Sequence, residues 1–212
     1  MPIPWNDDPP PGSLATIAAN VAVAGHDLLA QARTRVDPKL GLAQEWHRAI
    51  YRGVPLPVPY YAGEFRDTDA RFPQLLGYDI IVGGQLGVRS SDVPTQLAAF
   101  ERAMQSVATN LDAAVPAGSP PASGPELAAV ILFAAHAHGE WVRIHPFANG
   151  NGRTARCWAN FVALRYGMPA FVTIEPRPAD LLYAQAAHDS MRGDHTATEV
   201  LFRGLLRQAV GP

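Results

Sequence analysis

The spacing of apolar and polar residues along the chain predicts a protein built mainly from helices. Seven stretches carry apolar side chains at helical spacing or are rich in alanine and leucine, and they cover residues 13–35, 38–51, 94–115, 126–144, 153–166, 180–192 and 196–209. The stretch at 126–144 is apolar on nearly every side, which predicts a buried central helix. Two short β-prone runs flank Gly83 and Gly84 within YDIIVGGQLGVR (78–89), which predicts a hairpin. The pattern therefore favours a mostly α fold with one hairpin.

Proline-rich segments separate the predicted elements. Residues 1–12 contain five prolines and two aspartates, and we expect them to form an extended tail. Residues 54–66 are broken by prolines in the same way, and residues 116–125 have the composition of a flexible loop. The remaining chain, residues 13–212, is long enough to bury one core and is predicted to be a single domain.

Composition narrows the classes of function and partner. The formal net charge is −2, so the chain lacks the basic surface that binding to nucleic acid or to an anionic membrane requires. Its single cysteine, Cys157, excludes an internal disulfide and a zinc site built from cysteines. No apolar run approaches the roughly 18 residues of a membrane span, and the first residues lack the pattern of a secretory signal. We therefore expect a cytoplasmic protein that contacts neither nucleic acid nor membrane directly.

The run HPFANGNGRTAR, residues 145–156, carries the chemistry. Gly150–Gly152 leads into a predicted helix, so backbone N–H groups and the helix dipole can hold an anion there. Arg153 and Arg156 are spaced i, i+3, so both guanidinium groups can reach one polyphosphate. His145 can take up a proton near neutral pH. Each part alone is more often a simple turn, a solvated helix face or a structural histidine, but their contiguity favours attack by a hydroxyl on a nucleotide phosphate.

This run resembles the signature of the Fic family, His-Pro-Phe-x-(Asp/Glu)-Gly-Asn-Gly-Arg-x-x-Arg. The flanking segments HRAIYRG (47–53), YAGEFR (61–66) and DLLYAQAAHDSMRGD (180–194) also resemble family segments, so the likeness covers about residues 40–210. The resemblance implies an all-α fold, a compact helical bundle with a small β-hairpin flap over the active site. It also implies a protein adenylyltransferase, which transfers AMP from ATP to a Ser, Thr or Tyr hydroxyl of a target protein.

The resemblance assigns roles by position. His145 would be the general base, and Arg153 would bind the β- and γ-phosphates, with Arg156 at the γ-phosphate end. Phosphate binding and catalysis would also use the turn residues Gly150, Asn151 and Gly152, with Asn151 and Arg153 counted as catalytic. Tyr183 would lie near the nucleoside pocket, while Pro146 and Phe147 would be structural. The flap would pair with the target by strand addition through Ile80, Ile81, Val82, Leu86 and Val88.

One position departs from the signature: Asn149 replaces the acid that binds Mg²⁺. An amide oxygen can ligate Mg²⁺ without the formal charge of a carboxylate, so we expect ATP as substrate with a weakly held Mg²⁺. The alternative is a Fic-like module with weakened activity, another nucleotide donor, or non-catalytic binding of a nucleotide or partner. Gly152 favours AMP transfer, because the kinase-like Doc branch carries lysine at this position.

The chain lacks the family's inhibitory motif, (Ser/Thr)-x-x-x-Glu-(Gly/Asn). By resemblance to toxin–antitoxin members, control would come from a small antitoxin-like inhibitor that binds near Arg156, or would be absent. Outside the signature, Glu64 and Arg66 are predicted to form an ion pair that supports the flap. We expect His188 and His195 to be solvated.

Overall fold

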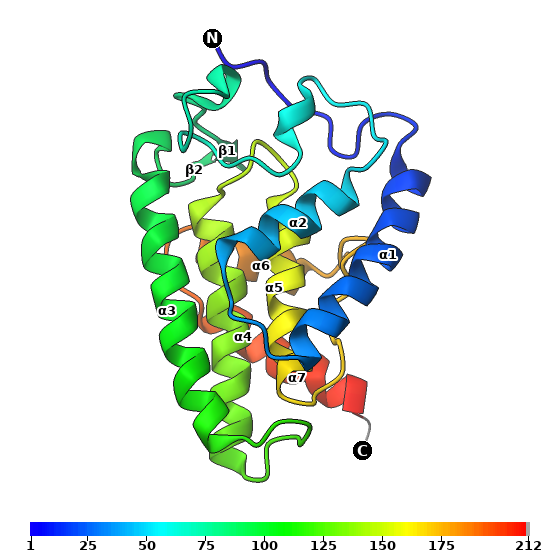
Figure 1. Cartoon of the computed structure of the whole chain (residues 1–212), viewed down its shortest axis with the longest axis vertical. Helices are drawn as coiled ribbons and strands as arrows, with labels where there is room; N and C mark the ends of the chain where they lie inside the picture. Colours follow the sequence, from blue (N-terminus) through cyan, green and yellow to red (C-terminus); the bar gives the residue numbers. More distant parts are fainter. Residues whose placement is uncertain (211–212) are drawn as a thin grey trace.

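The computed structural model describes residues 1–210, which form seven α-helices and one two-stranded antiparallel sheet (Figure 1). The helices are α1 (Leu14–Arg33), α2 (Leu40–Ile50), α3 (Val93–Ala114), α4 (Gly124–Ile144), α5 (Asn151–Arg165), α6 (Leu181–Ser190) and α7 (Thr196–Val210). The strands are β1 (Ile81–Val82) and β2 (Gln85–Leu86), and short 3-10 helices cover Pro59–Tyr61, Pro73–Leu75 and Ser90–Asp92. The predicted mostly helical fold with one hairpin is confirmed.

Local sequence explains where several helices begin. The Ser123 side chain accepts a hydrogen bond from the backbone N–H of Glu126, and Pro125 lies in the first turn of α4. In return, the Glu126 carboxylate accepts from the backbone N–H of Ala122, close to the start of the same helix. Asp180 caps α6 by accepting from the N–H of Leu182 at 2.8 Å.

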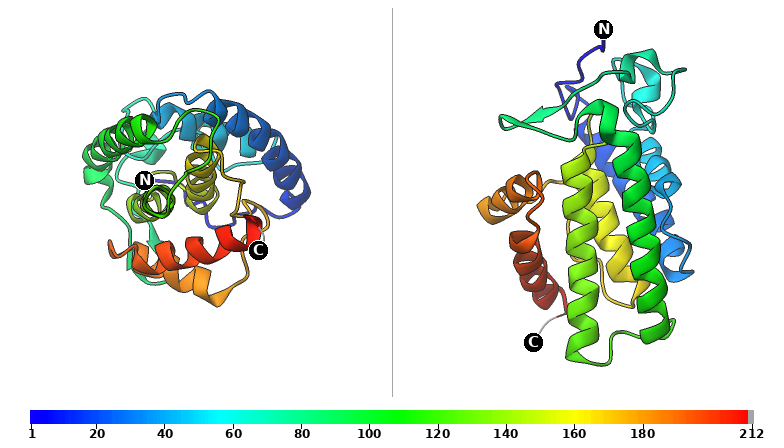
Figure 2. Two further views of the ribbon diagram at one scale, coloured as in Figure 1. Left: turned by 90° about the horizontal axis from the view of Figure 1, so that it is seen from below. Right: turned by 90° about the vertical axis from the view of Figure 1, so that its left-hand side faces the viewer.

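Helices α4 and α5 form the centre of the bundle. Helix α4 packs against α3, α5, α6 and α7, while α5 also packs against α1 and α2 (Figures 1 and 2). The more enclosed of the two is α5, in which all residues except Gly152 and Leu164 are buried. Because α4 exposes Leu132 and His136, the prediction that 126–144 would be the buried central helix describes α5 better. Within residues 1–210, no helix combines the length and apolar character needed to cross a membrane.

Aromatic side chains fill the space between these helices. Trp158 of α5 lies against Trp46 of α2 and Trp141 of α4, with ring centroids 4.9 and 5.8 Å apart. Trp46 is therefore a core residue. Cys157 is buried beside this cluster as a small apolar side chain, and burial raises the pKa of its thiol to about 12.

The N-terminal tail, residues 1–12, forms no helix or strand and packs on the bundle. It crosses the end of the bundle where the hairpin and the loop between α4 and α5 lie (Figures 1 and 2). Trp5 is only 3% exposed, and its ring lies against the rings of Tyr51 and Tyr61. Its backbone N–H donates to the hydroxyl of Tyr78 at 2.9 Å. The tail is thus part of the folded structure at the end that carries the signature.

Candidate active site

His145 ends α4 in a left-handed conformation, with φ of 52°. Its Nδ1 lies 2.6 Å from the carbonyl oxygen of Val142, so Nδ1–H donates there and Nε2 keeps its lone pair. Burial, together with the charge of Arg66, lowers the pKa of His145 to about 4. The imidazole is therefore neutral at pH 7 and able to accept a proton at Nε2.

The loop after His145 is closed by Asn151. The Asn151 side chain accepts from the N–H of Phe147 and donates to its carbonyl oxygen, both at 2.9 Å. The left-handed residue of this loop is Gly150, and the side-chain amide of Asn151 is used within the loop. Any contact of Asn151 with a phosphate would use its backbone N–H. Phe147 is fully buried, as its structural role requires.

His47 supports the loop from α2 and was missed by the sequence reasoning. Its ring stacks on Phe147 with centroids 3.9 Å apart, and Nε2 lies 3.0 Å from the carbonyl oxygen of Asn149. Because Nδ1 accepts from the N–H of Gly63, Nε2 carries the proton and donates. Burial lowers the pKa of His47 to about 3, which keeps it neutral. The signal was available, since His47 begins the flank HRAIYRG.

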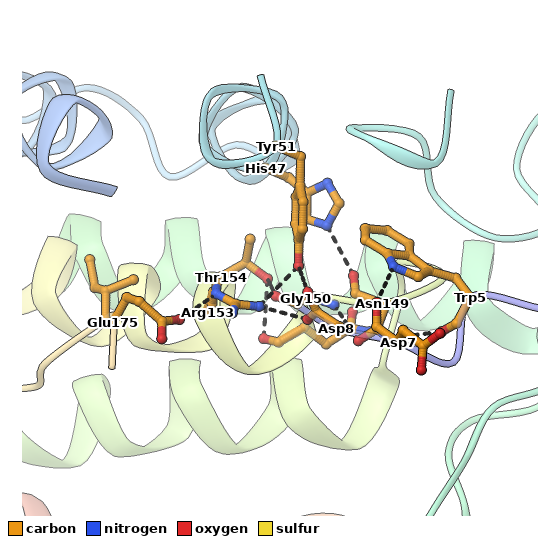
Figure 3. A network of polar contacts seen from close by, with 12 residues as sticks. Trp5, Asp7, Asp8, His47, Tyr51, Asn149, Gly150, Arg153, Thr154 and Glu175 are labelled. Carbon is orange, nitrogen blue, oxygen red and sulfur yellow. Dashed lines mark hydrogen bonds and ion pairs between the residues drawn. The ribbon is translucent and has the colours of Figure 1, made fainter. Parts of the chain in front are cut away.

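The two arginines of the signature both reach the same cavity but have different partners. Arg153 donates from Nε to Glu175 at 2.7 Å and from Nη1 to Asp8 at 2.6 Å (Figure 3). Nη1 of Arg153 also lies 3.1 Å from the hydroxyl of Tyr51. These contacts and the neighbouring negative charges outweigh burial and raise the pKa of Arg153. Neither Asp8 nor Glu175 was expected at the site from the sequence.

Arg156 is bound by neutral oxygens alone. Its Nε and Nη2 donate to the carbonyl oxygen of Ile174, and Nη1 donates to the hydroxyl of Tyr183 at 3.0 Å. That hydroxyl lies 2.9 Å from Nε2 of His138, whose pKa burial lowers to about 3. The neutral His138 therefore shares a hydrogen bond with the hydroxyl of Tyr183, which also accepts from Arg156. The sequence placed Tyr183 at this pocket but not His138.

Two cavities meet at His145 and Asn149. The larger, about 630 Å³, is bordered by Gly150–Arg153, Arg156 and Tyr183, together with Asp8 and Glu175 from outside the signature. The smaller, about 520 Å³, lies between the N-terminal tail and the hairpin, and its lining includes Ile80, Ile81 and Val82. The imidazole of His145 thus borders an anion-binding cavity on one side and a space beneath the hairpin on the other.

The hairpin matches the predicted flap. Ile81 pairs with Leu86 and Val82 with Gln85, and Gly83 and Gly84 both take positive φ in the turn. Ile81, Val82 and Leu86 are exposed, whereas Ile80 and Val88 are partly buried at the base. Ile81 and Val82 thus combine exposure to solvent with a place in the lining of the smaller cavity.

Arg66 holds the hairpin to the signature, but not through Glu64. The side chain of Arg66 is fully buried and donates to four carbonyl oxygens, which belong to Tyr78, Val88, Ile144 and His145. Glu64 pairs instead with Arg48 at 3.0 Å, so the predicted Glu64–Arg66 ion pair is wrong. The predicted support of the flap by Arg66 is present, because its donors join both ends of the hairpin to the His145 loop.

The histidines outside the signature differ from each other. His195 is not solvated as expected, because its Nε2 lies 2.8 Å from the Glu140 carboxylate and its side chain is mostly buried. His188 is exposed and contacts Gln85 of the hairpin. His188 also borders the larger cavity.

Asn149 does not fit the role of a metal ligand in this conformation. Its Nδ2 donates to the carbonyl oxygen of Trp5 at 2.8 Å, and its Oδ1 accepts from the N–H of Gly150 at 2.7 Å. Residues 1–210 contain no group of three His, Cys, Asp or Glu side chains placed to hold a metal ion. Both polar atoms of the Asn149 side chain are therefore already hydrogen-bonded, one to the tail and one to the loop.

Comparisons with known proteins identify the family of this chain. The model of the Fic/DOC family matches residues 38–163. The protein adenylyltransferase Fic of Drosophila grimshawi is 30% identical over 128 residues, which are 60% of this chain and 20% of that protein. The one from Nematostella vectensis is 48% identical over 48 residues, 23% of this chain and 11% of that protein. This chain thus spans a fifth or less of the length of these two relatives.

Solved structures share the fold at low identity. A Fic domain containing signaling protein from Bacteroides thetaiotaomicron has a TM-score of 0.60 at 21% identity, covering 92% of this chain and 70% of that chain. The BepC protein from Bartonella tribocorum, solved with bound AMPPNP, has a TM-score of 0.58 at 17% identity, covering 89% and 86% of the two chains. With the family model matching more than half of its length, this chain belongs to the Fic/DOC family.

Proposed function

We propose that this protein transfers AMP from ATP to a Ser, Thr or Tyr hydroxyl of a target protein. The observation that carries the proposal is the place of His145, which borders both cavities with Nδ1 bound to Val142 and Nε2 unprotonated. In the larger cavity, the N–H groups of Asn151 and Gly152 begin α5 and lack partners within the helix, so they can hold a phosphate. The smaller cavity, beneath the hairpin, gives an acceptor side chain access to His145.

The transfer is a single displacement at phosphorus. The acceptor hydroxyl oxygen forms a bond to the α-phosphorus, while the bond from that phosphorus to the oxygen bridging to the β-phosphate breaks. Pyrophosphate leaves with the electron pair of the broken bond, and the hydroxyl proton moves to Nε2 of His145. Arg156 is the side chain best placed to hold the departing phosphates, because its charge has no carboxylate partner among its contacts.

Two further features support AMP transfer. A Cβ atom at Gly152 would lie 3.2 Å from Nη1 of Arg156, so a side chain here, such as the lysine of the kinase-like Doc branch, would crowd the guanidinium. The exposed apolar residues of the hairpin, Ile81 and Leu86, offer a strand edge to a target segment. In this proposal Mg²⁺ would be bound by the phosphates of the donor nucleotide, because the Asn149 side chain is hydrogen-bonded to Trp5 and Gly150.

A second candidate function is a module with weakened or switched nucleotide chemistry. The observation that favours it is the same commitment of Asn149, which leaves no carboxylate at the position where the Fic signature has one. On this reading the protein binds a nucleotide or a partner without efficient AMP transfer from ATP.

Labelling with ATP separates the candidates. The protein is incubated with candidate target proteins and with ATP labelled at either the α- or the γ-phosphorus. The proposal expects only the α-label on protein, lost in His145→Ala and kept in His26→Ala, a change to an exposed histidine of α1. Transfer of only the γ-label would show a kinase and overturn the proposal, and tight ATP binding without any transfer would favour the second candidate.

A further inference from the structure

The segment Trp5–Asp8, named here the strap, binds directly to the phosphate-binding side of the site (Figure 3). Oδ2 of Asp8 lies 2.6 Å from Nη1 of Arg153, and Oδ1 accepts from the hydroxyl of Tyr51 at 2.8 Å. The side chains of Asp8 and Arg153 are only 10% and 7% exposed, so solvent screens this ion pair little. The strap thus places a buried carboxylate against an arginine of the signature.

The other end of the strap is anchored on the loop that carries His145. The carbonyl oxygen of Trp5 accepts from Nδ2 of Asn149, and the backbone N–H of Trp5 donates to Tyr78. The indole lies against Tyr51 at 4.8 Å and stacks on Tyr61 at 6.1 Å between ring centroids. An aromatic anchor of this kind fixes where the Asp8 carboxylate lies.

The charges at the two signature arginines are unequal. Arg153 faces two carboxylates, Asp8 from the strap and Glu175 from the loop before α6. Arg156 donates only to the neutral oxygens of Ile174 and Tyr183. A phosphate that enters the 630 Å³ cavity therefore finds Arg156 without an acidic partner but meets excess negative charge at Arg153.

We propose that the strap is an intrachain inhibitor of the nucleotide site, in which Asp8 occupies the place on Arg153 that a donor phosphate needs. A carboxylate and a phosphate oxygen make the same charge-assisted hydrogen bond to a guanidinium, so the two compete for one position. Glu175 binds Nε of Arg153, whereas Asp8 binds Nη1, so release of Asp8 does not itself require Glu175 to let go of the guanidinium. This regulation rests on the proposed nucleotide chemistry, and it lies within the chain.

The strap weakens phosphate binding by an amount that depends on the open state, in which Asp8 has left Arg153, and on the fraction of molecules in that state. If only the open state binds phosphate, the apparent dissociation constant is the intrinsic one divided by the open fraction. A strap that is closed about nine-tenths of the time therefore weakens binding about tenfold. Loss of the Asp8 carboxylate removes that factor.

Titration calorimetry with inorganic triphosphate and with ATP tests the strap on the full chain. Asp8→Asn removes the charge that faces Arg153, and we expect binding about tenfold tighter than in the unaltered protein. Asp7→Asn is the matched control: the same charge is lost one residue earlier in the strap, from an exposed side chain, while the backbone carbonyl of residue 7 can still accept from the Trp5 indole. Binding in Asp8→Asn that equals Asp7→Asn, or is weaker, would overturn the proposal.

Hydrogen exchange on the unaltered protein gives a second test that needs no folded variant. Saturating triphosphate is expected to speed amide exchange at Trp5–Asp8 while it slows exchange at the start of α5. Unchanged exchange in the strap, with triphosphate bound, contradicts displacement. The outcomes are separable from those of the labelling experiment: AMP transfer with an unresponsive strap refutes the strap alone, and a displaced strap without AMP transfer refutes only the proposed transfer.

Discussion

Gly150 lies where the backbone and the neighbouring side chains both forbid a β-carbon. Its φ is +76°, a region that costs a non-glycine residue about 1–2 kcal/mol. A Cβ atom would also lie 2.5 Å from the hydroxyl oxygen of Tyr51 and 2.8 Å from Nε2 of His47. Both rings are buried and hydrogen-bonded, so neither can move away freely. Overpacking of this kind costs about 1–3 kcal/mol more.

We therefore expect Gly150→Ala to lower the free energy of unfolding by about 2–5 kcal/mol, the sum of both costs. Gly118→Ala is the matched control, because Gly118 has the same φ of +76° but no atom within 4 Å of an added Cβ. That control should lose only the backbone cost, about 1–2 kcal/mol. Urea unfolding followed by tryptophan fluorescence measures both.

The comparison separates crowding from backbone strain. Equal losses in Gly150→Ala and Gly118→Ala would show that Tyr51 and His47 yield to the new methyl group, and the crowding argument would be wrong. Tyr51→Phe in the Gly150→Ala background removes the closest atom and should recover part of the loss. It should not recover all of it, because Cε2 of Tyr51 would remain 2.7 Å from the Cβ.

Three further predictions follow from single contacts. Asn149→Asp replaces the N–H donor to the Trp5 carbonyl by a carboxylate oxygen that faces this carbonyl. We expect faster amide exchange in the strap and more transfer of α-label to the target. Unchanged transfer would count against the inhibitory role of the strap and against the metal role of a carboxylate at position 149. As pH falls from 7 to 5, His138 takes up a proton in the unfolded chain but stays neutral in the folded protein, so the free energy of unfolding should fall by on the order of 2 kcal/mol. Urea titrations should show a smaller fall in His138→Gln than in His26→Gln. Arg66→Lys should destabilise by about 2–4 kcal/mol in urea unfolding, since an ammonium cannot reach four carbonyls, and a loss below 0.5 kcal/mol would contradict this account.

The helices and the hairpin follow from local signals. Apolar periodicity and prolines predicted the helix ends to within a few residues, and Gly83-Gly84 predicted the turn, because these signals act between near neighbours in the chain. The enclosure of α5 could not be predicted in this way. Its buried Asn160 and Arg165 look like surface residues, and their partners at Val172 and Asp112 lie 12 and 53 residues away.

The site shows the same division between contiguous and distant residues. His145, Arg153 and Arg156 were found because the signature is contiguous and its backbone geometry is local. Asp8 and Glu175 reach Arg153 from segments that have no pattern of their own, 145 and 22 residues away. Only the folded chain brings these three side chains together.

The strap also gives a physical reason for asparagine at position 149. An amide can donate to the carbonyl of Trp5 and accept from the N–H of Gly150 at the same time, whereas a carboxylate can only accept. Asn149, the residue that departs from the Fic signature, is therefore also the residue whose hydrogen bond to Trp5 holds the strap; we call this hydrogen bond the latch. The latch and the Arg153–Asp8 pair lie at opposite ends of a four-residue segment, so release of either end loosens the other. A nucleotide that displaces Asp8 would in this way free Asn149 as well, and phosphate binding and the opening of the strap become one event.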